Sequence, residues 1–537
     1  MLKIIAFTIF IISFSAHAAS QNGSFFSRVS NDKAFYLPGG QASIHVGLNN
    51  QTGSIFNGTI SLAICLRGQI VNLVDQIRTE AVGENNVATF SFTIPRLNAK
   101  GYQLSIVALN NGDKGLASCS GTGSTSAAPV DIASGAINIA ANAQEDPIEA
   151  YVDPQAMQSA DFGVIADNLA QYHINMVQFY DWGYRHDEPY TAADSWRNLE
   201  SISVTKTETQ NLIQAFWKYG MFTQLYVSWN GAYSDWPTQD TNVSLSMGAF
   251  KNRCGLSGSC MPADQFVTAS GWSAWGWAAD GSVQENPGNG TWVRWIVSQY
   301  RAAMSGWGFN GVHVDTMGDP GVPLYDWRGN PLPDLGASLA DFVNYAGDLT
   351  GVCTDINQVS GWNIQDVAVR GHSCNLYVEP HPEFNNFGKF SDVDALTQQF
   401  REWSSRPLIL AYYPQQVMNG TLSPTSQWQV AGDNVTVCNP NSQTGCMANN
   451  PGIELLAGQV ALSSASPLLL GDYDHIIPGP FFPGASLGID ANLQQYRSDY
   501  WNWFVGQRDV LRDGVTPDTS LVAYLTDSSG NALGDSS

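Results

Sequence analysis

Short apolar runs alternate with amphipathic segments of helical length between residues 148 and 472, and this pattern limits the fold more than any other feature. The amphipathic segments, such as Trp292–Trp307, carry apolar residues at helical spacing and predict helices. The apolar runs predict eight strands: Ile148–Val152, Ile174–Trp182, Phe222–Trp229, Gly311–Met317, Gly361–Val369, Asn375–Pro380, Leu408–Tyr413 and Pro467–Asp472. Eight strands that alternate with helices predict an α/β fold, the (β/α)8 TIM barrel.

The region before this alternation has the pattern of an all-β domain. Runs such as Ala42–Leu48 and Gln103–Leu109 alternate apolar and polar residues, and Gly, Asn and Asp turns separate them. The pattern predicts an immunoglobulin-like β-sandwich over residues 19–143 that ends in a small, polar linker. The barrel is predicted over residues 144–514, and residues 515–537 are expected to form a short or truncated C-terminal β segment.

The first 18 residues have the features of a secretory signal peptide. Lys3 supplies the positive charge, Ile4–Phe14 is the apolar region, and Ala16-His17-Ala18 fits a cleavage site with small residues. This apolar run is too short to span a bilayer, and no later stretch is long enough. We therefore expect an exported protein without a membrane span, extracellular or, in a Gram-negative bacterium, periplasmic.

The eight cysteines fall along the sequence as four neighbouring pairs: Cys65/Cys119, Cys254/Cys260, Cys353/Cys374 and Cys438/Cys446. Export favours disulfides, although nearest-neighbour pairing is one of many connectivities. No Cys or His spacing typical of zinc occurs, so no metal or other cofactor is expected, and a structural calcium ion is left open. A monomer is expected.

The composition narrows the class of ligand. A net charge of -23 disfavours a nucleic acid as partner, because phosphate backbones bind basic surfaces. The 17 Trp, 20 Tyr and 24 Phe exceed what a core requires, and exposed aromatic faces suit stacking on sugar rings. A neutral ligand is compatible with both features.

Polar side chains stand where the predicted barrel strands end: Asp181, Asn230, Asp315, Glu379 and Asp472. TIM barrels carry their catalytic groups at these C-terminal strand ends. Glycoside cleavage needs one carboxylate near the anomeric carbon and one carboxylic acid at the leaving oxygen. Asp315 and Glu379 are the best candidates, since they end the fourth and sixth strands. The alternatives are that Asp315 caps the next element and that Glu379 pairs with an arginine such as Arg370 or Arg401.

The segment Ile174–Pro189 reads Ile-Asn-Met-Val-Gln-Phe-Tyr-Asp-Trp-Gly-Tyr-Arg-His-Asp-Glu-Pro and resembles the hallmark of glycoside hydrolase family 66. Four further segments are similar to that family: Gly308–Asp319, Tyr377–Pro380, Glu454–Asp472 and Tyr500–Gly514. The family contains endo-dextranases and cycloisomaltooligosaccharide glucanotransferases. The resemblance therefore implies a TIM barrel after a β-domain, an α-1,6-linked glucan substrate and a retaining mechanism. The family usually has a full C-terminal β-domain, so the short segment after Gly514 leads us to expect either that this domain is lost or that the sequence is truncated.

The resemblance also implies roles for individual residues. Asp315 matches the nucleophile and Glu379 the acid/base, which retention places about 5–5.5 Å apart. His313, two residues before Asp315 on the same strand, shares its face and is expected near the substrate. The resemblance implies a set of glucose-binding residues: Tyr180, Asp181, His186, Asp187 and Asp472 lining the subsite, with Trp229 and Asn230 beside it.

Hydrolysis of internal dextran bonds to isomalto-oligosaccharides is the favoured activity. Ring-forming glucanotransferases of this family carry an extra carbohydrate-binding module in the barrel, and the stretch from Pro414 to Pro451 is too short for one. The alternatives are a glucanotransferase making cyclic or transferred products, another α-glucan hydrolase, or a sugar-binding protein on an inactive barrel. His313 occupies the position where α-amylase-like barrels have arginine, and intact Asp315 and Glu379 disfavour an inactive barrel.

Overall fold

The computed structural model describes residues 25–513 apart from 51–52, 79–81, 84–86, 95, 112–114, 120–123, 126–128, 153, 155–160, 200, 230, 234, 240–241, 254–259, 262–263, 266–281, 353, 360, 381–389, 412–428, 431–435, 438–449, 469–474, 477–486 and 489–490. The expected signal peptide and the C-terminal β segment lie outside the described residues.

The N-terminal region forms two antiparallel sheets, as the β-sandwich prediction requires. One sheet has the order β1-β2-β5 and the other β4-β3-β6-β9. Their bounds are β1 (Phe26–Asn31), β2 (Ala42–Asn49), β3 (Gly58–Leu66), β4 (Gln69–Arg78), β5 (Val87–Ile94), β6 (Lys100–Asn110) and β9 (Asp131–Ile139), with a small hairpin of β7 (Gly115–Leu116) and β8 (Ser124–Thr125). Alternate residues of β2, such as Ile44 and Val46, are buried in the shared core.

A disulfide joins Cys65 on β3 to Cys119, which confirms the first predicted pair. Cys260 and Cys374 are also disulfide-bonded. Their predicted partners, Cys254 and Cys353, and the fourth pair lie outside the described residues, so those pairings stay predictions.

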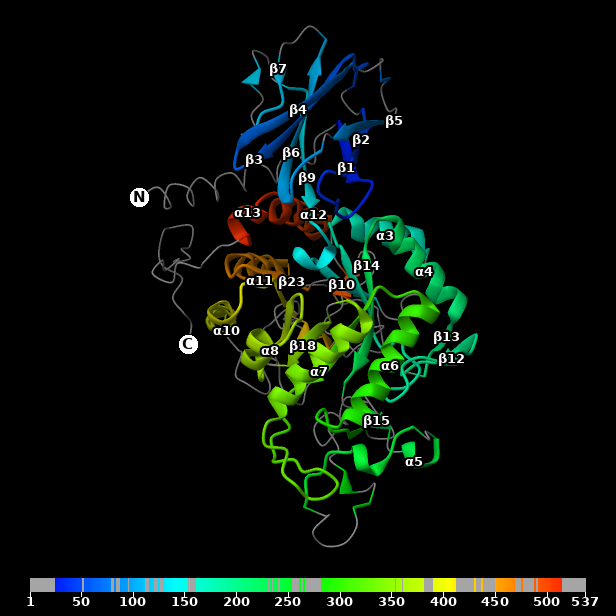
Figure 1. The fold of residues 1–537 in the computed structure, drawn as a ribbon. Coiled ribbons are helices and arrows are strands. Elements are labelled where there is room, and N and C mark those ends of the chain that lie inside the picture. Colours follow the sequence, from blue (N-terminus) through cyan, green and yellow to red (C-terminus); the bar gives the residue numbers. More distant parts are fainter. Residues whose placement is uncertain are drawn as a thin grey trace.

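The predicted barrel is confirmed as an eight-stranded sheet in which every neighbouring pair is parallel (Figure 1). Its order follows the chain: β10 (Glu149–Val152), β11 (Met176–Phe179), β14 (Phe222–Ser228), β17 (Gly311–Met317), β18 (Asp355–Val359), β19 (Leu376–Glu379), β20 (Leu408–Leu410) and β23 (Ala465–Pro467). This simple order places β17 and β19 next to the same neighbour, β18.

The fifth strand was wrongly predicted. It is β18, whereas most of the predicted run Gly361–Val369 forms helix α8 (Ile364–Arg370). In α8 the buried residues Ile364, Val367 and Ala368 follow helical spacing. The strand β18 escaped prediction because three of its five residues, Asp, Asn and Gln, are polar, although all five are buried.

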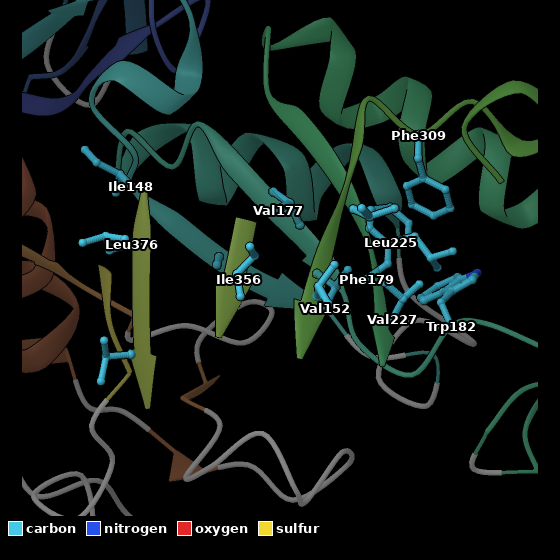
Figure 2. Packing of buried hydrophobic residues seen from close by; sticks show 14 of the residues in the cluster. Ile148, Val152, Val177, Phe179, Trp182, Leu225, Val227, Phe309, Ile356 and Leu376 are labelled. Atoms are coloured by element: carbon cyan, nitrogen blue, oxygen red, sulfur yellow. The ribbon is translucent and has the colours of Figure 1, made fainter. Parts of the chain in front are cut away.

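Helices cover the outside of the barrel: α3 (Phe162–Gln171), α4 (Lys206–Lys218), α6 (Gly290–Trp307), α7 (Leu335–Thr350), α8, α10 (Phe390–Trp403), α11 (Asn450–Leu462) and α12 (Ala491–Gly506), followed by α13 (Arg508–Leu511). Figure 2 shows the apolar layer between helices and strands, with Val177, Leu225 and Ile356 among its labelled residues. Complete burial of one such side chain contributes about 1.5–3 kcal/mol, so this layer contributes strongly to the stability of the barrel.

Helix α6 delivers the chain into β17. The side chain of Asn289 caps its first turn by accepting hydrogen bonds from the backbone N–H groups of Thr291 and Trp292. Gly308 ends the helix with φ 102°, a left-handed conformation that glycine adopts without strain. The strand then starts at Gly311, as predicted.

The β-sandwich meets the barrel at the N-terminal ends of the strands, with α12 and α13 between the two (Figure 1). At Gly101 on β6 a Cβ atom would collide with the backbone oxygen of Val505 on α12, so only glycine permits this close approach.

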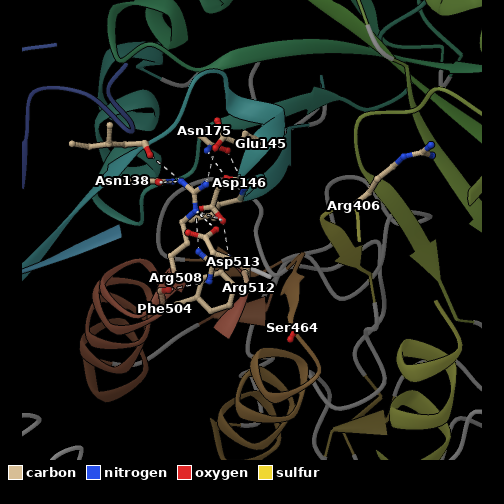
Figure 3. A network of polar contacts seen from close by, with 12 residues as sticks. Asn138, Glu145, Asp146, Asn175, Arg406, Ser464, Phe504, Arg508, Arg512 and Asp513 are labelled. Carbon is tan, nitrogen blue, oxygen red and sulfur yellow. Dashed lines mark hydrogen bonds and ion pairs between the residues drawn. The ribbon is translucent and has the colours of Figure 1, made fainter. Parts of the chain in front are cut away.

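An ion-pair cluster, here called the clamp, ties these elements together (Figure 3). Arg512 binds both oxygens of Asp146, at 2.7 and 3.0 Å. Arg508 donates to the backbone oxygen of Ile139 on β9 at 2.9 Å, and its other nitrogens lie 3.1 Å from Glu145 and 3.0 Å from Asp513. Asp146 and Arg508 are buried, so the charges are paired away from solvent.

The remaining short elements lie in the connections: η1 (Ala143–Glu145), β12 (Ser195–Arg197), β13 (Ser203–Thr205), β15 (Gly231–Tyr233), α5 (Trp236–Gln239), η2 (Leu245–Met247), β16 (Ser282–Gln284), β21 (Gln429–Val430), β22 (Thr436–Val437), β24 (His475–Ile476) and β25 (Leu487–Gly488). Among the described helices, none has the length and apolar character needed to cross a bilayer.

Candidate active site

The two faces of the barrel strands differ in chemistry. On β17 the outward residues Val312 and Val314 pack into the apolar layer, while His313 and Asp315 lie on the opposite face. The same alternation on β18 places Ile356 outward and Asn357 inward. The interior of this barrel therefore carries hydrogen-bonding groups, and the outside carries the apolar core.

Asp315 lies near the C-terminal end of β17 and is 6% exposed. The Tyr226 hydroxyl on β14 donates a short hydrogen bond to its Oδ2 atom. The amide Nδ2 of Asn357 donates to its Oδ1 atom at 2.7 Å. Each oxygen of the predicted nucleophile is thus held by a neutral donor from a different neighbouring strand.

Glu379 is the last residue of β19 and is 2% exposed. Its Oε2 atom accepts a hydrogen bond of 2.8 Å from the same Nδ2 atom of Asn357. The structure therefore brings the two predicted catalytic carboxyl groups together, bridged by one side chain. The arginines weighed as partners of Glu379 bind elsewhere: Arg370 lies 3.5 Å from Asp341, and Arg401 donates to backbone oxygens.

Tyr226 is suited to act as a permanent donor. Burial, and then the negative charge of Asp315, raise its pKa well above the usual value, so the hydroxyl keeps its proton. Its ring lies 4.7 Å from that of Tyr180, the residue that follows β11. Tyr180 is itself buried, and this predicted glucose-binding residue lies against Tyr226, the tyrosine that is bonded to Asp315.

Asp181 has the left-handed backbone conformation, with φ 46°. Non-glycine residues rarely adopt it, and such positions cluster at functional sites. Asn198 stabilises this turn by donating a 3.0 Å hydrogen bond to the backbone oxygen of Asp181. The side chain of Asp181 is buried near Tyr226, whose pKa its charge helps to raise.

Asp187 and His186 occupy the loop after β11. Arg185 binds both carboxylate oxygens of Asp187, at 2.9 and 3.1 Å, so this buried carboxylate is paired and shapes the loop. Burial, and then the charge of Arg185, lower the pKa of His186 to about 4, so the ring is neutral at pH 7. The His186 ring lies 5.6 Å from that of Tyr233.

Other predicted glucose-binding residues have different surroundings. Trp229 is buried in the apolar layer, and its backbone oxygen accepts a 2.9 Å hydrogen bond from Trp292. Asn230 and Asp472 lie outside the described residues, so their roles stay predictions.

His313 lies one step deeper in the barrel than Asp315. Its Nδ1 atom is 2.8 Å from Oδ2 of Asp355, and its ring stacks near that of Tyr226. Asn375 donates to the other oxygen of Asp355 at 2.6 Å, and Gln224 bonds both Asp355 and Glu149. His313, Asp355, Asn375, Gln224 and Glu149 thus form a hydrogen-bonded layer beneath the carboxylate pair, here called the floor.

This floor also holds the group of described residues that comes closest to a metal site. The ligand atoms of Glu149, His313 and Asp355 lie within 4.8 Å of one another. The N–H groups of Gln224 and Asn375 point at the same carboxylates, which a cation would have to displace. Burial, and then the charge of Asp355, raise the pKa of Glu149 well above its usual value, which favours the neutral form of Glu149 in this cluster.

Sequence reasoning missed two residues of this site, Tyr226 and Asn357. Tyr226 sat in a predicted strand, two residues before its end, and the alternation of that strand could have placed it inward. Asn357 could not be found, because the strand that carries it was assigned to the wrong segment.

Comparisons with known proteins support one family. The sequence model of Glycosyl hydrolase family 66 matches residues 31–533. Over 380 residues the chain is 27% identical to a cycloisomaltooligosaccharide glucanotransferase of Niallia circulans, covering 68% of this chain and 35% of that protein. Over 262 residues it is 23% identical to a dextranase of Streptococcus salivarius, covering 45% of this chain and 31% of that protein. The chain thus spans about a third of the length of these curated relatives.

The fold is shared with a solved structure. A Paenibacillus sp. cycloisomaltooligosaccharide glucanotransferase complexed with cycloisomaltoheptaose superposes with a TM-score of 0.73 at 18% identity, over 91% of this chain and 82% of that one. At this identity the likeness speaks for the fold alone. The family match covers nearly the whole sequence, and the chain therefore belongs to glycosyl hydrolase family 66.

Proposed function

We propose that the protein is a retaining glycoside hydrolase that cleaves internal α-1,6-glucosidic bonds of dextran and releases isomalto-oligosaccharides. The observation that carries the proposal is the buried pair of Asp315 and Glu379, joined through one nitrogen of Asn357. Because both hydrogen bonds start at the same nitrogen, the distance between Oδ1 of Asp315 and Oε2 of Glu379 cannot exceed the sum of their two lengths. That limit supports the separation of about 5–5.5 Å used by retaining enzymes, rather than the roughly 6.5–9.5 Å of inverting ones.

In the first step an oxygen of Asp315 attacks the anomeric carbon of the glucosyl unit. Glu379 gives its proton to the glycosidic oxygen, the carbon–oxygen bond breaks, and a glycosyl ester forms on Asp315. The donors of Tyr226 and Asn357 fix the plane of the Asp315 carboxylate, which reduces the orientational freedom lost in reaching the transition state.

In the second step Glu379, now ionised, removes a proton from water. The water oxygen attacks the anomeric carbon, the ester bond breaks, and Asp315 leaves as a carboxylate. The two inversions restore the α configuration. Burial of both carboxyl groups keeps the charge changes in a low-dielectric setting, where fixed donors act strongly.

We propose the remaining predicted residues as parts of the glucose subsite and its frame. Tyr180 and Asp181 are supported by their place beside Tyr226, while Asp187 and His313 are supported as residues that position their neighbours. The family resemblance alone supports a place in the glucose subsite for Trp229, His186, Asn230 and Asp472.

The experiment is incubation of the protein with dextran, starch and pullulan, with sizing of the products over time. The proposal expects isomalto-oligosaccharides from dextran alone and an early fall in viscosity, and proton NMR should first detect the α anomer at new reducing ends. Breakdown of starch without dextran would refute the substrate, and initial release of the β anomer would refute retention.

A glucanotransferase is the second candidate, because curated relatives with that activity match this chain. It uses the same glycosyl ester and differs in the acceptor, a sugar hydroxyl in place of water. Products that are longer than the added isomalto-oligosaccharide, or that lack a reducing end, would identify it.

We propose further that the protein is exported. The disulfide between Cys65 and Cys119 supports an oxidising compartment, because reducing cytosol seldom permits such bonds. N-terminal sequencing of protein from the culture medium or periplasm should start near residue 19, and an intact Met1 in the cytosol would contradict export.

A further inference from the structure

Asn357 stands between the two catalytic carboxyl groups because its strand does. β18 lies between β17, which carries Asp315, and β19, which carries Glu379. Asn357 is 2% exposed, and its single Nδ2 atom donates to both, at 2.7 and 2.8 Å. An amide nitrogen has two hydrogens, so each carboxyl group receives one of them.

The proposed reaction moves one negative charge between those two hydrogens. Before attack Asp315 is ionised and Glu379 carries the proton. After attack Asp315 is an uncharged ester and Glu379 is ionised, because its proton has gone to the leaving oxygen. The pair therefore holds one negative charge throughout, first on one side of Asn357 and then on the other.

We infer that Asn357 is a catalytic residue of both half-reactions, which stabilises this charge on whichever carboxyl group holds it. The inference rests on the proposed retaining function. Hydrogen bonds to an ionised acceptor are about twice as strong as neutral ones, so the amide strengthens one bond as it weakens the other. No side chain has to move between the two steps, which is the condition for preorganised stabilisation.

The chemistry of the amide suits this position. A lysine or arginine there would hold both carboxyl groups ionised and remove the proton that the first step needs. Tyr226 cannot replace Asn357, because its hydroxyl has one hydrogen and donates it to Asp315. The other titratable groups close to the pair in the described part of the chain come from the neighbouring strands and the floor: Tyr180, Asp181, His313, Asp355 and Tyr377.

The test is the variant Asn357→Ala, with Asn375→Ala as matched control. Asn375 is an equally buried barrel asparagine that donates to a carboxylate, Asp355, in the floor. A donor lost from an ionised carboxylate makes ionisation harder, so both limbs of the pH profile of dextran hydrolysis should move to higher pH by about one unit in Asn357→Ala. The activity should fall roughly 10²–10³-fold.

A merely structural role would lower activity without moving either limb, and Asn375→Ala should behave in that way. Thermal unfolding shows whether each variant is folded. Unmoved limbs in folded Asn357→Ala overturn the inference.

Carbon-13 NMR titration of the labelled carboxyl groups provides a readout that needs no substrate, with assignment from Asp315→Asn and Glu379→Gln. The midpoints of both groups should rise in Asn357→Ala, and unchanged midpoints refute the inference. A wild-type protein that cleaves no α-glucan, yet shows these shifts in the variant, would sink the proposed function and leave the role of Asn357 as donor to both carboxyl groups standing.

Discussion

Two buried carboxylate clusters lie at opposite ends of the barrel and are held in opposite ways. At the N-terminal end Asp146 is bound by two nitrogens of Arg512, with Arg508 beside it. At the C-terminal end Asp315 and Glu379 are bound by an amide and a phenol. The clamp uses cations as partners, and the proposed catalytic pair uses neutral donors.

We relate this difference in partners to two roles, stability for the clamp and reactivity for the proposed catalytic pair. Burial favours the protonated form of Asp146, but Arg512 and Arg508 outweigh it and lower its pKa, so this carboxylate stays ionised and inert. Neutral donors orient a carboxylate without committing it to one charge state. A pair that exchanges a proton and forms an ester, as proposed for Asp315 and Glu379, therefore needs the second kind of partner.

The largest expected loss of activity comes from a substitution in the proposed catalytic pair. Asp315→Asn removes the nucleophile but keeps the size of the side chain, so activity on dextran should fall by roughly 10⁴–10⁶-fold. Initial rates measure the loss, and thermal unfolding should show little change. Near-normal activity in a folded variant would place the site elsewhere.

Removal of the proton donor should cost less. Glu379→Ala is expected to lower activity by roughly 10²–10⁴-fold, because general acid–base assistance is lost in both steps. On a glucosyl substrate whose leaving group needs no acid, such as a fluoride, added azide should restore part of the rate and yield a glucosyl azide, since a small anion can attack the ester without a base. The Asp315→Asn variant is the control and should show no rescue; equal rescue of both would contradict the assigned roles.

Damage to the clamp should affect stability instead of catalysis. Asp146→Asn leaves Arg508 and Arg512 without their buried counter-charge and should cost about 3–5 kcal/mol in unfolding free energy, with unchanged activity per folded molecule. Because the pKa of Asp146 is lowered on folding, its stabilisation is complete above the unfolded value of about 3.9 and is lost below it, so the deficit should shrink in acid.

Urea unfolding at several pH values measures this deficit. Arg28→Ala is the matched control, because its 2.7 Å pair with Asp167 joins the sandwich to α3 at a partly exposed site and should contribute less than about 1 kcal/mol. Equal losses in both variants would remove the distinction between buried clamp and surface pair.

The smallest effect sharpens the role of the neutral donors. Tyr226→Phe removes one hydrogen bond to Asp315 and should reduce kcat/KM by roughly 10–100-fold. Tyr300→Phe is the control, since that buried hydroxyl donates to the backbone oxygen of Ser228 outside the pair. Comparable losses of activity in the two variants would show that Tyr226 acts through stability and has no specific effect on Asp315.

The strand of Asp315 was predictable because its outward residues are apolar and its boundaries are marked by glycine. Gly311–Met317 was predicted with the observed bounds, and Glu379 was placed correctly at the end of its strand. The strand between them was not predictable in the same way. Its polar residues are buried inside the barrel by the neighbouring strands β17 and β19, which no local pattern records.

The amino-acid sequence by itself determined the alternation of strands and helices, the two candidate carboxyl groups and the family, because these depend on local periodicity and on residue type. Only the tertiary structure decided which groups hold the carboxylates. Tyr226 and Asn357 reach Asp315 from strands that are 89 and 42 residues away in the chain. Parallel pairing along the barrel sheet brings them within hydrogen-bonding distance, and that pairing is a property of the whole sheet rather than of any segment.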